Sequence, residues 1–407
     1  MSKQNNKGRQ VDLYHKPMVF FTFVITCKLK PIFSNMSQYI YLDYAASTPI
    51  DPKILEQLNT SMTEMYANPS NTESLKSNNL ADQTSEAATQ ILKAFNTPLN
   101  DLIFTSGATE SINTILKGLY NHPSNTKSKI ITAQTEHSAV FEVCKELESY
   151  GLEIITLKNN RQGEVDLQEL KEQIDTNTLA VVLMGVNNET GLIHPLEQIA
   201  DLAHQKDALF ICDTTQTVGK IETNYQLFDA FTISAHKIYG PKGIGALVFN
   251  KKLKIAPLIH GGGQQNHLRA GTLPTPLILA LEQAITLAQD HVKERNQHVS
   301  HIQIHFETEL QKIADIQVIA NHANRSPYIS NIRFLHIDFE ALRLALRPYV
   351  AFSSGSACKA KVIDTSRVIK ALNLDNTSPV HNLRFSFSHL TTINDIDKVI
   401  SQIKAII

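Results

Sequence analysis

Short apolar runs alternate with helical patterns through the middle of the chain, and this alternation limits the possible folds more than any other feature of the sequence. The expected strands lie at residues 102–105, 130–132, 153–157, 179–186 and 208–212. A segment with apolar residues at helical spacing lies between each strand and the next. Strands that alternate with helices form βαβ units, so we expect an α/β fold with a mainly parallel sheet between helices.

The pattern changes near residue 290. Residues 276–295 predict one long helix, and residues 298–313 continue the helical pattern. The remaining chain mixes short strands and helices, with strands expected at 329–333 and 382–386. We therefore expect a smaller α+β domain there, because 407 residues are too many for one simple core.

Polar side chains follow the ends of the expected strands, which is where ligands bind in parallel sheets. We expect these hydroxyl, imidazole, amide, carboxylate and amine groups to converge on one cleft: residues 106–109, His137, 187–189, 213–216 and 234–237. The first of these segments is a glycine turn that opens a helix, an arrangement that binds anions, and Thr109 adds a hydroxyl. Simple helix capping is an equally common use of such a turn.

Lys237 follows an apolar run at residues 230–233 and precedes a turn rich in glycine. A lysine at the edge of a buried strand can lose its hydration, which lowers the pKa of the amine and makes it nucleophilic. An ordinary lysine at a strand end is the more common explanation of this stretch alone. Asp213 ends another apolar run, where a carboxylate is either a helix cap or a functional group. A buried lysine with a buried carboxylate is the pair that pyridoxal phosphate requires, because the lysine forms an imine and the carboxylate keeps the pyridine nitrogen protonated.

The composition excludes several classes of partner. The net charge is −1, so nothing predicts binding to nucleic acids or to anionic membranes. The four cysteines lie far apart, which argues against a disulfide framework or a cysteine-rich zinc site and agrees with a cytoplasmic protein. No metal site is expected elsewhere, because His298, His301 and His305 lack acidic or cysteine companions in the sequence.

Residues 1–36 differ from the rest of the chain. Basic residues precede a mostly apolar run at 18–27, which weakly resembles a signal peptide but is too short to span a bilayer. Met36 then opens a sequence typical of a globular domain. We expect residues 1–36 to be a disordered extension or a non-native start.

Ten short motifs along residues 39–407 resemble those of the pyridoxal-phosphate cysteine desulfurases of the NifS/IscS type, in the class-V aminotransferase family. Each motif alone is weak, but their order over nearly the whole chain is specific. They are YLDYAASTP (41–49), FTSGATES (104–111), TEHSAV (135–140), VNNETG (186–191), DTTQTVGK (213–220), SAHKIYGPKGIG (234–245), HGGGQQ (260–265), RAGT (269–272), SSGSAC (353–358) and LRFS (383–386).

The resemblance implies the fold of type I pyridoxal-phosphate transferases, with a mainly parallel seven-stranded sheet. It implies a large cofactor-binding domain at residues 51–290, and a small α+β domain made of residues 37–50 and 291–407. It also implies a homodimer that converts L-cysteine to L-alanine. The sulfur would go to acceptor proteins of iron–sulfur cluster assembly, tRNA thiolation or cofactor biosynthesis.

The resemblance also implies a role for each matching residue. Lys237 would bind the cofactor covalently and shuttle protons, His137 would stack on its ring, and Asp213 would pair with the pyridine nitrogen. Arg384 would bind the substrate carboxylate, for which a planar guanidinium is suited. The other cofactor-binding residues would be Ala108, Thr109, Asn188 (also a substrate contact), Gln216, Ser234, His236 and, from the partner subunit, Thr272.

Cys358 would be the nucleophile that accepts the sulfur as a persulfide. It lies in a stretch rich in serine and glycine, which predicts a mobile exposed loop, whereas Cys144 and Cys212 lie in an expected helix and strand and are expected to be buried. Lys359 and Lys361 depart from the family pattern. We expect these lysines to lower the pKa of the Cys358 thiol or to alter which acceptor protein docks.

Other functions remain open on the sequence alone. Within the same fold, the chain could instead be a selenocysteine lyase or an aminotransferase. Substitution of Cys358 would distinguish these enzymes from a cysteine desulfurase. A non-catalytic scaffold for sulfur relay would need a lost cofactor site, yet Lys237, Asp213 and His137 are all present. A serine hydrolase is unsupported, because the Gly-rich segment after His260 has no Gly-x-Ser-x-Gly companion.

Overall fold

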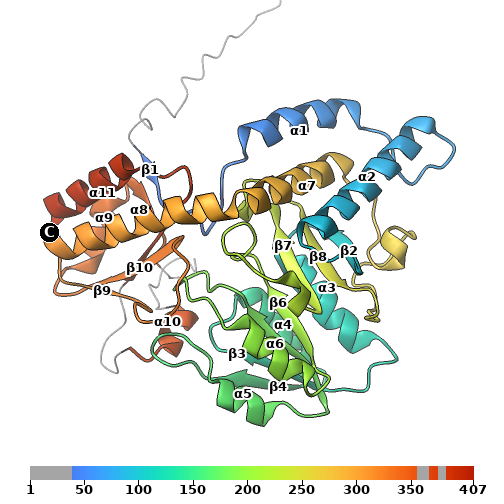
Figure 1. Cartoon of the computed structure of the whole chain (residues 1–407), viewed down its shortest axis with the longest axis horizontal. Coiled ribbons are helices and arrows are strands. Elements are labelled where there is room, and N and C mark those ends of the chain that lie inside the picture. Colours follow the sequence, from blue (N-terminus) through green and yellow to red (C-terminus); the bar gives the residue numbers. More distant parts are fainter. Residues whose placement is uncertain (1–38, 355–365, 375–381) are drawn as a thin grey trace, which may run out of the picture. The chain divides into compact units, whose positions relative to one another are not determined.

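The computed structural model describes residues 39–354, 366–374 and 382–407, all within the second of the two units, residues 1–38 and 39–407, into which the chain divides (Figure 1). The strands are β1 (Ile40–Tyr41), β2 (Asn100–Thr105), β3 (Lys129–Ala133), β4 (Glu153–Leu157), β5 (Thr178–Met184), β6 (Leu209–Asp213), β7 (Ala230–Ser234), β8 (Gly245–Asn250), β9 (Ile316–Val318), β10 (Ile329–Phe334), β11 (Val350–Ala351) and β12 (Asn382–Ser386). The helices are α1 (Pro52–Glu64), α2 (Leu75–Ala94), α3 (Ala108–Asn121), α4 (Ser138–Ser149), α5 (Leu167–Gln173), α6 (Leu196–His204), α7 (Thr275–Asp290), α8 (Val292–Ile313), α9 (Phe339–Leu346), α10 (Arg367–Ala371) and α11 (Ile393–Ile406).

A seven-stranded sheet, in the order β2-β8-β7-β6-β5-β3-β4, forms the centre of the fold. The strands β4, β3, β5, β6 and β7 are mutually parallel, and β8 runs antiparallel to both β7 and β2. The expected mainly parallel sheet and fold type are therefore confirmed. The sequence predicts a turn after Lys237 and does not reveal β8, because the glycines there are more prominent than the short apolar run that follows them.

Both faces of this sheet are buried, because consecutive residues of a strand point to opposite faces. In β5, Val181 and Leu183 join one hydrophobic cluster while Ala180 and Val182 join another. The first cluster includes residues of α2, α5, α6 and α7, and the second includes residues of α3 and α4. The sheet thus lies between two layers of helices, and the strand ends meet the loops that carry the polar residues.

A second, antiparallel sheet, in the order β12-β10-β9, has its own hydrophobic cluster with residues of α8, α9 and α11. The short strand β1 pairs with β11, so residues 40–41 lie beside residues 350–351. One long helix was expected at 276–295, but α7 ends and α8 begins around His291, whose φ of −111° and ψ of 11° are not helical. The two helices nevertheless continue in nearly the same direction (Figure 1).

Two expectations about single segments can be compared with the structure. Cys144 and Cys212 are buried, as predicted. No helix among the described residues combines the length and the apolar character needed to cross a membrane. Cys358, Lys359, Lys361 and the extension at residues 1–36 lie outside the described residues.

Candidate active site

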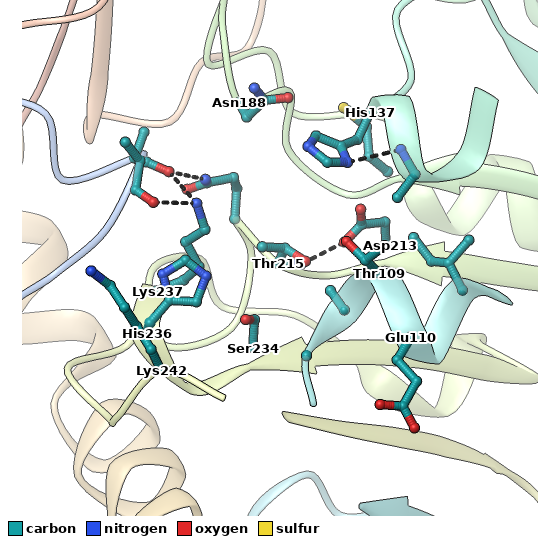
Figure 2. Close-up of a pocket in the computed structure, with 18 of the residues that line it drawn as sticks. Thr109, Glu110, His137, Asn188, Asp213, Thr215, Ser234, His236, Lys237 and Lys242 are labelled. Carbon is teal, nitrogen blue, oxygen red and sulfur yellow. Dashed lines mark hydrogen bonds between the residues drawn. The ribbon is translucent and has the colours of Figure 1, made fainter. Parts of the chain in front are cut away.

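A cavity of about 530 Å³ lies at the carboxyl ends of β5, β6 and β7, beside the first turns of α3 and α4 (Figure 2). Its lining contains ten residues that the sequence analysis assigned to the site: Ala108, Thr109, His137, Asn188, Asp213, Gln216, Ser234, His236, Lys237 and Arg384. Thr272 is exposed and does not line this cavity. The remaining predicted residue, Cys358, is outside the described part of the chain.

Lys237 ends a short 3-10 helix directly after β7, and its amine points into the cavity (Figure 2). Nζ donates to the backbone oxygens of Ala45 and Ala46 at 2.8 and 2.7 Å. These two carbonyls belong to the loop after β1, which the backbone bond from Thr48 N to His236 O holds at 2.9 Å. Burial, together with the charge of Arg384, lowers the pKa of Lys237 to about 8. The neutral, nucleophilic amine is therefore much more abundant near pH 7 than in an exposed lysine.

Asp213 is the last residue of β6 and is buried. Thr232 is its register partner on β7 and donates from Oγ1 to Asp213 Oδ1 at 3.1 Å, and Thr215 N donates to the same oxygen at 3.0 Å. Among the described residues, both hydrogen bonds to this carboxylate use Oδ1, which leaves Oδ2 for a ligand in the cavity. Thr215 belongs to the segment expected at the cleft, residues 213–216, but the sequence does not predict Thr232, because register partners cannot be read from one strand alone.

His137 is the residue before α4, and its Nδ1 accepts from Ala139 N at 3.1 Å. A ring nitrogen that accepts carries no proton, so in the neutral imidazole the hydrogen is on Nε2. By its accessible surface His137 is exposed, but the protein atoms around it disfavour the charged ring and lower its pKa. The ring is therefore a neutral, flat surface at the cavity wall.

The first turn of α3 forms the opposite end of the cavity. Gly107 has a φ of 152°, and a Cβ at this position would lie 3.5 Å from Ser234 Oγ. A Cβ on Gly245 would lie only 2.3 Å from Ile233 O and 2.7 Å from Gly107 Cα. The backbone at Gly245 is therefore too close to these two segments for any side chain at this position. The free N–H groups of a helix N-terminus bind anions, and Ser234 and Thr109 add hydroxyls there.

His236 lies beside this anion site and is neutral. Burial and the neighbouring charges of Lys237 and Lys242 lower its pKa to about 4. A neutral imidazole can still donate one hydrogen bond to an anion. Lys242 also lines the cavity and was not predicted as a site residue.

Glu110 connects the anion site to the loop that carries Thr272. Arg269 donates from Nε to Glu110 Oε1 at 2.8 Å, and Ser106 N donates to Oε2 at 2.7 Å. Burial by itself would raise the pKa of Glu110, but these hydrogen bonds and the Arg269 charge lower it. The ion pair is part-buried and joins residues 159 positions apart, which local sequence patterns do not reveal.

Arg384 on β12 is held by two acceptors. Nη2 donates to Asp43 Oδ1 at 2.7 Å and Nη1 donates to Asn188 O at 2.8 Å. Its buried Nε has no hydrogen-bond partner in the part of the chain that the structure describes. A buried guanidinium with an unused donor is suited to a carboxylate ligand. Asp43 was not predicted as a site residue, although it lies within the first motif.

A second cavity of about 300 Å³ shares His137, Asn188 and Arg384 with the first. Ser353 and Ser366 also line it, and these residues flank the undescribed segment that contains Cys358. Ser366 Oγ donates to Glu189 Oε2 at 2.5 Å. Ser353 and Ser366 therefore lie close to the predicted substrate site.

The donor set fits pyridoxal phosphate. The cavity offers an amine for the aldehyde, a carboxylate oxygen for the pyridine nitrogen, and a helix N-terminus with hydroxyls for the phosphate. These groups come from Lys237, Asp213, and the start of α3 with Ser234. The fold and the site together define a pyridoxal-phosphate enzyme of fold type I.

Comparisons with known proteins agree. Residues 40–399 match the family described as "Aminotransferase class-V". The chain is 35% identical over 380 residues to "Cysteine desulfurase IscS" of Rickettsia rickettsii (strain Iowa), covering 92% of each chain. A solved structure named "NIFS-LIKE PROTEIN" has a TM-score of 0.83 and 29% identity, over 90% of this chain and 99% of its own. Another, "SspA in complex with cysteine", has a TM-score of 0.76 and 32% identity, over 87% and 100%. The chain belongs to the class-V aminotransferase family, in its NifS/IscS branch.

Proposed function

We propose that this protein is a cysteine desulfurase, which converts L-cysteine to L-alanine and transfers the sulfur to Cys358. The observation that carries the proposal is that the Lys237 amine and the Asp213 carboxylate line one cavity with the α3 N-terminus. The relatives with the name cysteine desulfurase, and the similar structure whose name includes cysteine, support the choice of substrate.

In this proposal the cofactor, when bound, withdraws electrons from the bonds of the substrate Cα. Lys237 Nζ removes and returns the Cα proton, which a pKa of about 8 allows near neutral pH. Asp213 Oδ2 would hold the proton of the pyridine nitrogen, and His137 would cover one ring face. The phosphate would be held by Ala108, Thr109, Ser234, His236 and, from the partner subunit, Thr272.

Arg384 and Asn188 orient the substrate carboxylate, and Gln216 donates toward the ring hydroxyl. The Cys358 thiolate then attacks the substrate sulfur. The S–S bond forms as the bond between the substrate Cβ and Sγ breaks, and that electron pair remains on the carbon side. Protonation of the carbon gives alanine. Cys358 then carries a persulfide, whose outer sulfur an acceptor thiol later takes.

The proposal includes a homodimer in the cytoplasm that passes sulfur to acceptor proteins. The exposure of Thr272, on a loop tied to α3 through Arg269 and Glu110, supports its contact with a second copy. Residues 51–290 would form the cofactor domain, and residues 37–50 and 291–407 the small domain. The separate hydrophobic cluster around the three-stranded sheet supports this division.

Product analysis of the purified enzyme with L-cysteine and a thiol tests the proposal. We expect equal amounts of alanine and sulfide, and loss of both products from cysteine in Cys358→Ser. A Cys358→Ser enzyme that still forms alanine from cysteine would instead indicate a lyase without a persulfide. A wild-type protein without visible cofactor absorbance would indicate a scaffold.

A further inference from the structure

Lys220 is a buried lysine without an acidic partner. Its residue is 6% exposed, and no carboxylate lies within ion-pair distance of it among the described residues. Within the described part of the chain, its amine makes one hydrogen bond, from Nζ to Gln216 Oε1 at 2.6 Å. A buried charge that is not paired destabilises a fold, so its retention needs a reason.

The bond from Lys220 determines which way the Gln216 amide faces. A protonated lysine amine can only donate, and the atom that it contacts is the amide oxygen, Oε1. The amide nitrogen then points the other way, and Nε2 donates to Ala45 O at 2.9 Å. If the amide were reversed, its oxygen would face the Ala45 oxygen and two acceptors would oppose each other.

This chain of hydrogen bonds ends at the proposed catalytic amine. Ala45 O accepts from Gln216 Nε2 and also from Lys237 Nζ, at 2.8 Å. Figure 2 shows the Lys237 amine beside its two backbone oxygen acceptors at the cavity wall. Gln216 lines the cavity and Lys220 does not, so Lys220 can act on the cavity only through its neighbour or through its charge.

The turn after β6 sets these positions. Thr217 N and Lys220 N donate to Thr214 O and Thr217 O at 2.9 and 3.0 Å, which places Gln216 and Lys220 on one side of a helical turn. Asn296 of α8 donates to Lys220 O at 2.9 Å and fixes the end of the turn. Burial and the charges of Lys237 and Arg384 lower the pKa of Lys220 to about 7, and the amine remains a donor in both protonation states.

We propose that Lys220 is a positioning residue of the cofactor site, which holds the Gln216 amide with its N–H groups toward Ala45 and the cavity. The proposal deepens the function proposed above, because those N–H groups would face the ring hydroxyl of the bound cofactor. Without Lys220 the amide can reverse, and its oxygen would then oppose both Ala45 O and the ring oxygen.

The test is a double-mutant cycle on the holoenzyme. Lys220→Met removes the donor at similar length, and Gln216→Leu removes the amide. Two properties are measured without substrate: the rate of cofactor release after dilution, and the pH midpoint of the visible cofactor absorbance. We expect each single variant to release the cofactor about tenfold faster, the usual size for one lost buried hydrogen bond. We expect the double variant to match Gln216→Leu alone.

Two further variants separate positioning from other roles. Lys220→Gln keeps a donor without the charge and should restore release and midpoint toward the wild-type values. Lys129→Met removes another buried lysine, which pairs with Asp175 at 2.6 Å, and should leave both cofactor properties unchanged. If Lys220→Met does not fold, Lys220→Leu provides the same loss of the donor with a smaller side chain.

Wild-type cofactor release in Lys220→Met, or additive effects in the double variant, would overturn the proposal. The result is independent of the proposed reaction, because neither measurement uses cysteine. An enzyme that binds the cofactor but forms no alanine would refute the desulfurase function and leave the Lys220 test valid. If the enzyme forms alanine but substitution of Lys220 changes neither cofactor release nor the pH midpoint of the absorbance, only the positioning role is refuted.

Discussion

At the level of single residues, burial and neighbouring charge set the state of the groups that face the cavity. The lowered pKa of Lys237 follows from lost hydration and from Arg384. Burial is also the main cause that lowers the pKa of His137 and of His236, and the charge of Lys237 adds to it at both rings. The site therefore presents a nucleophilic amine and neutral donors to an anionic ligand, which is the arrangement that a phosphate cofactor needs.

The lowered pKa of Lys237 predicts how cofactor loading depends on pH. Only the neutral amine reacts with an aldehyde, and its fraction rises through a pKa of about 8. Visible absorbance should thus develop faster as the pH rises from 6.5, with a midpoint near 8 when cofactor is added to the apo-protein. A midpoint above 10, as for an exposed lysine, would contradict this environment, and Lys237→Ala should give no such absorbance.

Arg384 predicts a change in substrate affinity. Arg384→Lys keeps a positive charge but loses the planar fork and the fixed contacts to Asp43 and Asn188. We expect the KM for L-cysteine to rise about tenfold or more, because a charged hydrogen bond contributes roughly 1.5–3 kcal/mol. Steady-state kinetics check this, with cofactor absorbance as the control. An unchanged KM would show that the guanidinium does not bind the substrate.

Among the elements, β8 determines where the α3 N-terminus lies. Its first residue, Gly245, leaves no space for a side chain between Ile233 O and Gly107 Cα. The strand therefore joins two segments of the proposed phosphate site, the end of β7 and the start of α3, which are far apart in sequence.

Gly245→Ala should therefore destabilise the protein. The added Cβ must displace backbone atoms, so we expect a loss of about 2–4 kcal/mol in the free energy of unfolding, together with weaker cofactor binding. Gly243→Ala is the matched control, because a Cβ there would meet nothing within 4 Å and only its φ of 86° is unfavourable. We expect about 1 kcal/mol for that variant. Urea unfolding measures both losses, and equal losses of unfolding free energy in the two variants would contradict the steric argument.

The connection between β3 and α4 contains a fully buried acid, Glu136. Burial raises its pKa to about 8, and its Oε2 has no partner among the described residues. Between pH 5 and 8 the folded protein holds a proton here that the unfolded chain has released, so stability falls as the pH rises through this window.

Glu136→Gln removes that dependence. The amide oxygen can still accept from Met184 N, which donates to Glu136 Oε1 at 2.8 Å. Between pH 6 and 8 we expect the wild type to lose roughly 2 kcal/mol more unfolding free energy than the variant. Urea unfolding of both proteins at pH 6 and pH 8 measures this difference. Equal losses of unfolding free energy in the wild type and the variant would show that Glu136 is not protonated in the folded protein.

Local patterns predicted the strands and helices of the large sheet, since the alternation of buried runs with amphipathic segments is strong there. They also predicted the cluster of site residues, because the carboxyl ends of parallel strands meet at one edge. They did not reveal β8, a short strand after prominent glycines, or the break at His291. Contacts such as Asp43 with Arg384 join distant segments, and no spacing rule connects residues 341 positions apart.

For the whole molecule, the two sheets contribute different parts of one site. The seven-stranded sheet supplies Lys237, Asp213 and Ser234, and the three-stranded sheet supplies Arg384 through β12. Asp43, from the loop after β1, and Asn188 connect that arginine to the cofactor side. In the proposed function, cofactor chemistry and substrate binding would therefore depend on the same contacts between the two sheets.

The central claim is that this site passes sulfur from L-cysteine to Cys358. Mass spectrometry of the peptide that contains Cys358, after brief incubation of the holoenzyme with L-cysteine, tests the claim directly. We expect one added sulfur atom on Cys358 in the wild type, in an amount equal to the alanine formed, and none in Lys237→Ala. Alanine formed without sulfur on Cys358, or sulfur on Cys358 in Lys237→Ala, would contradict it.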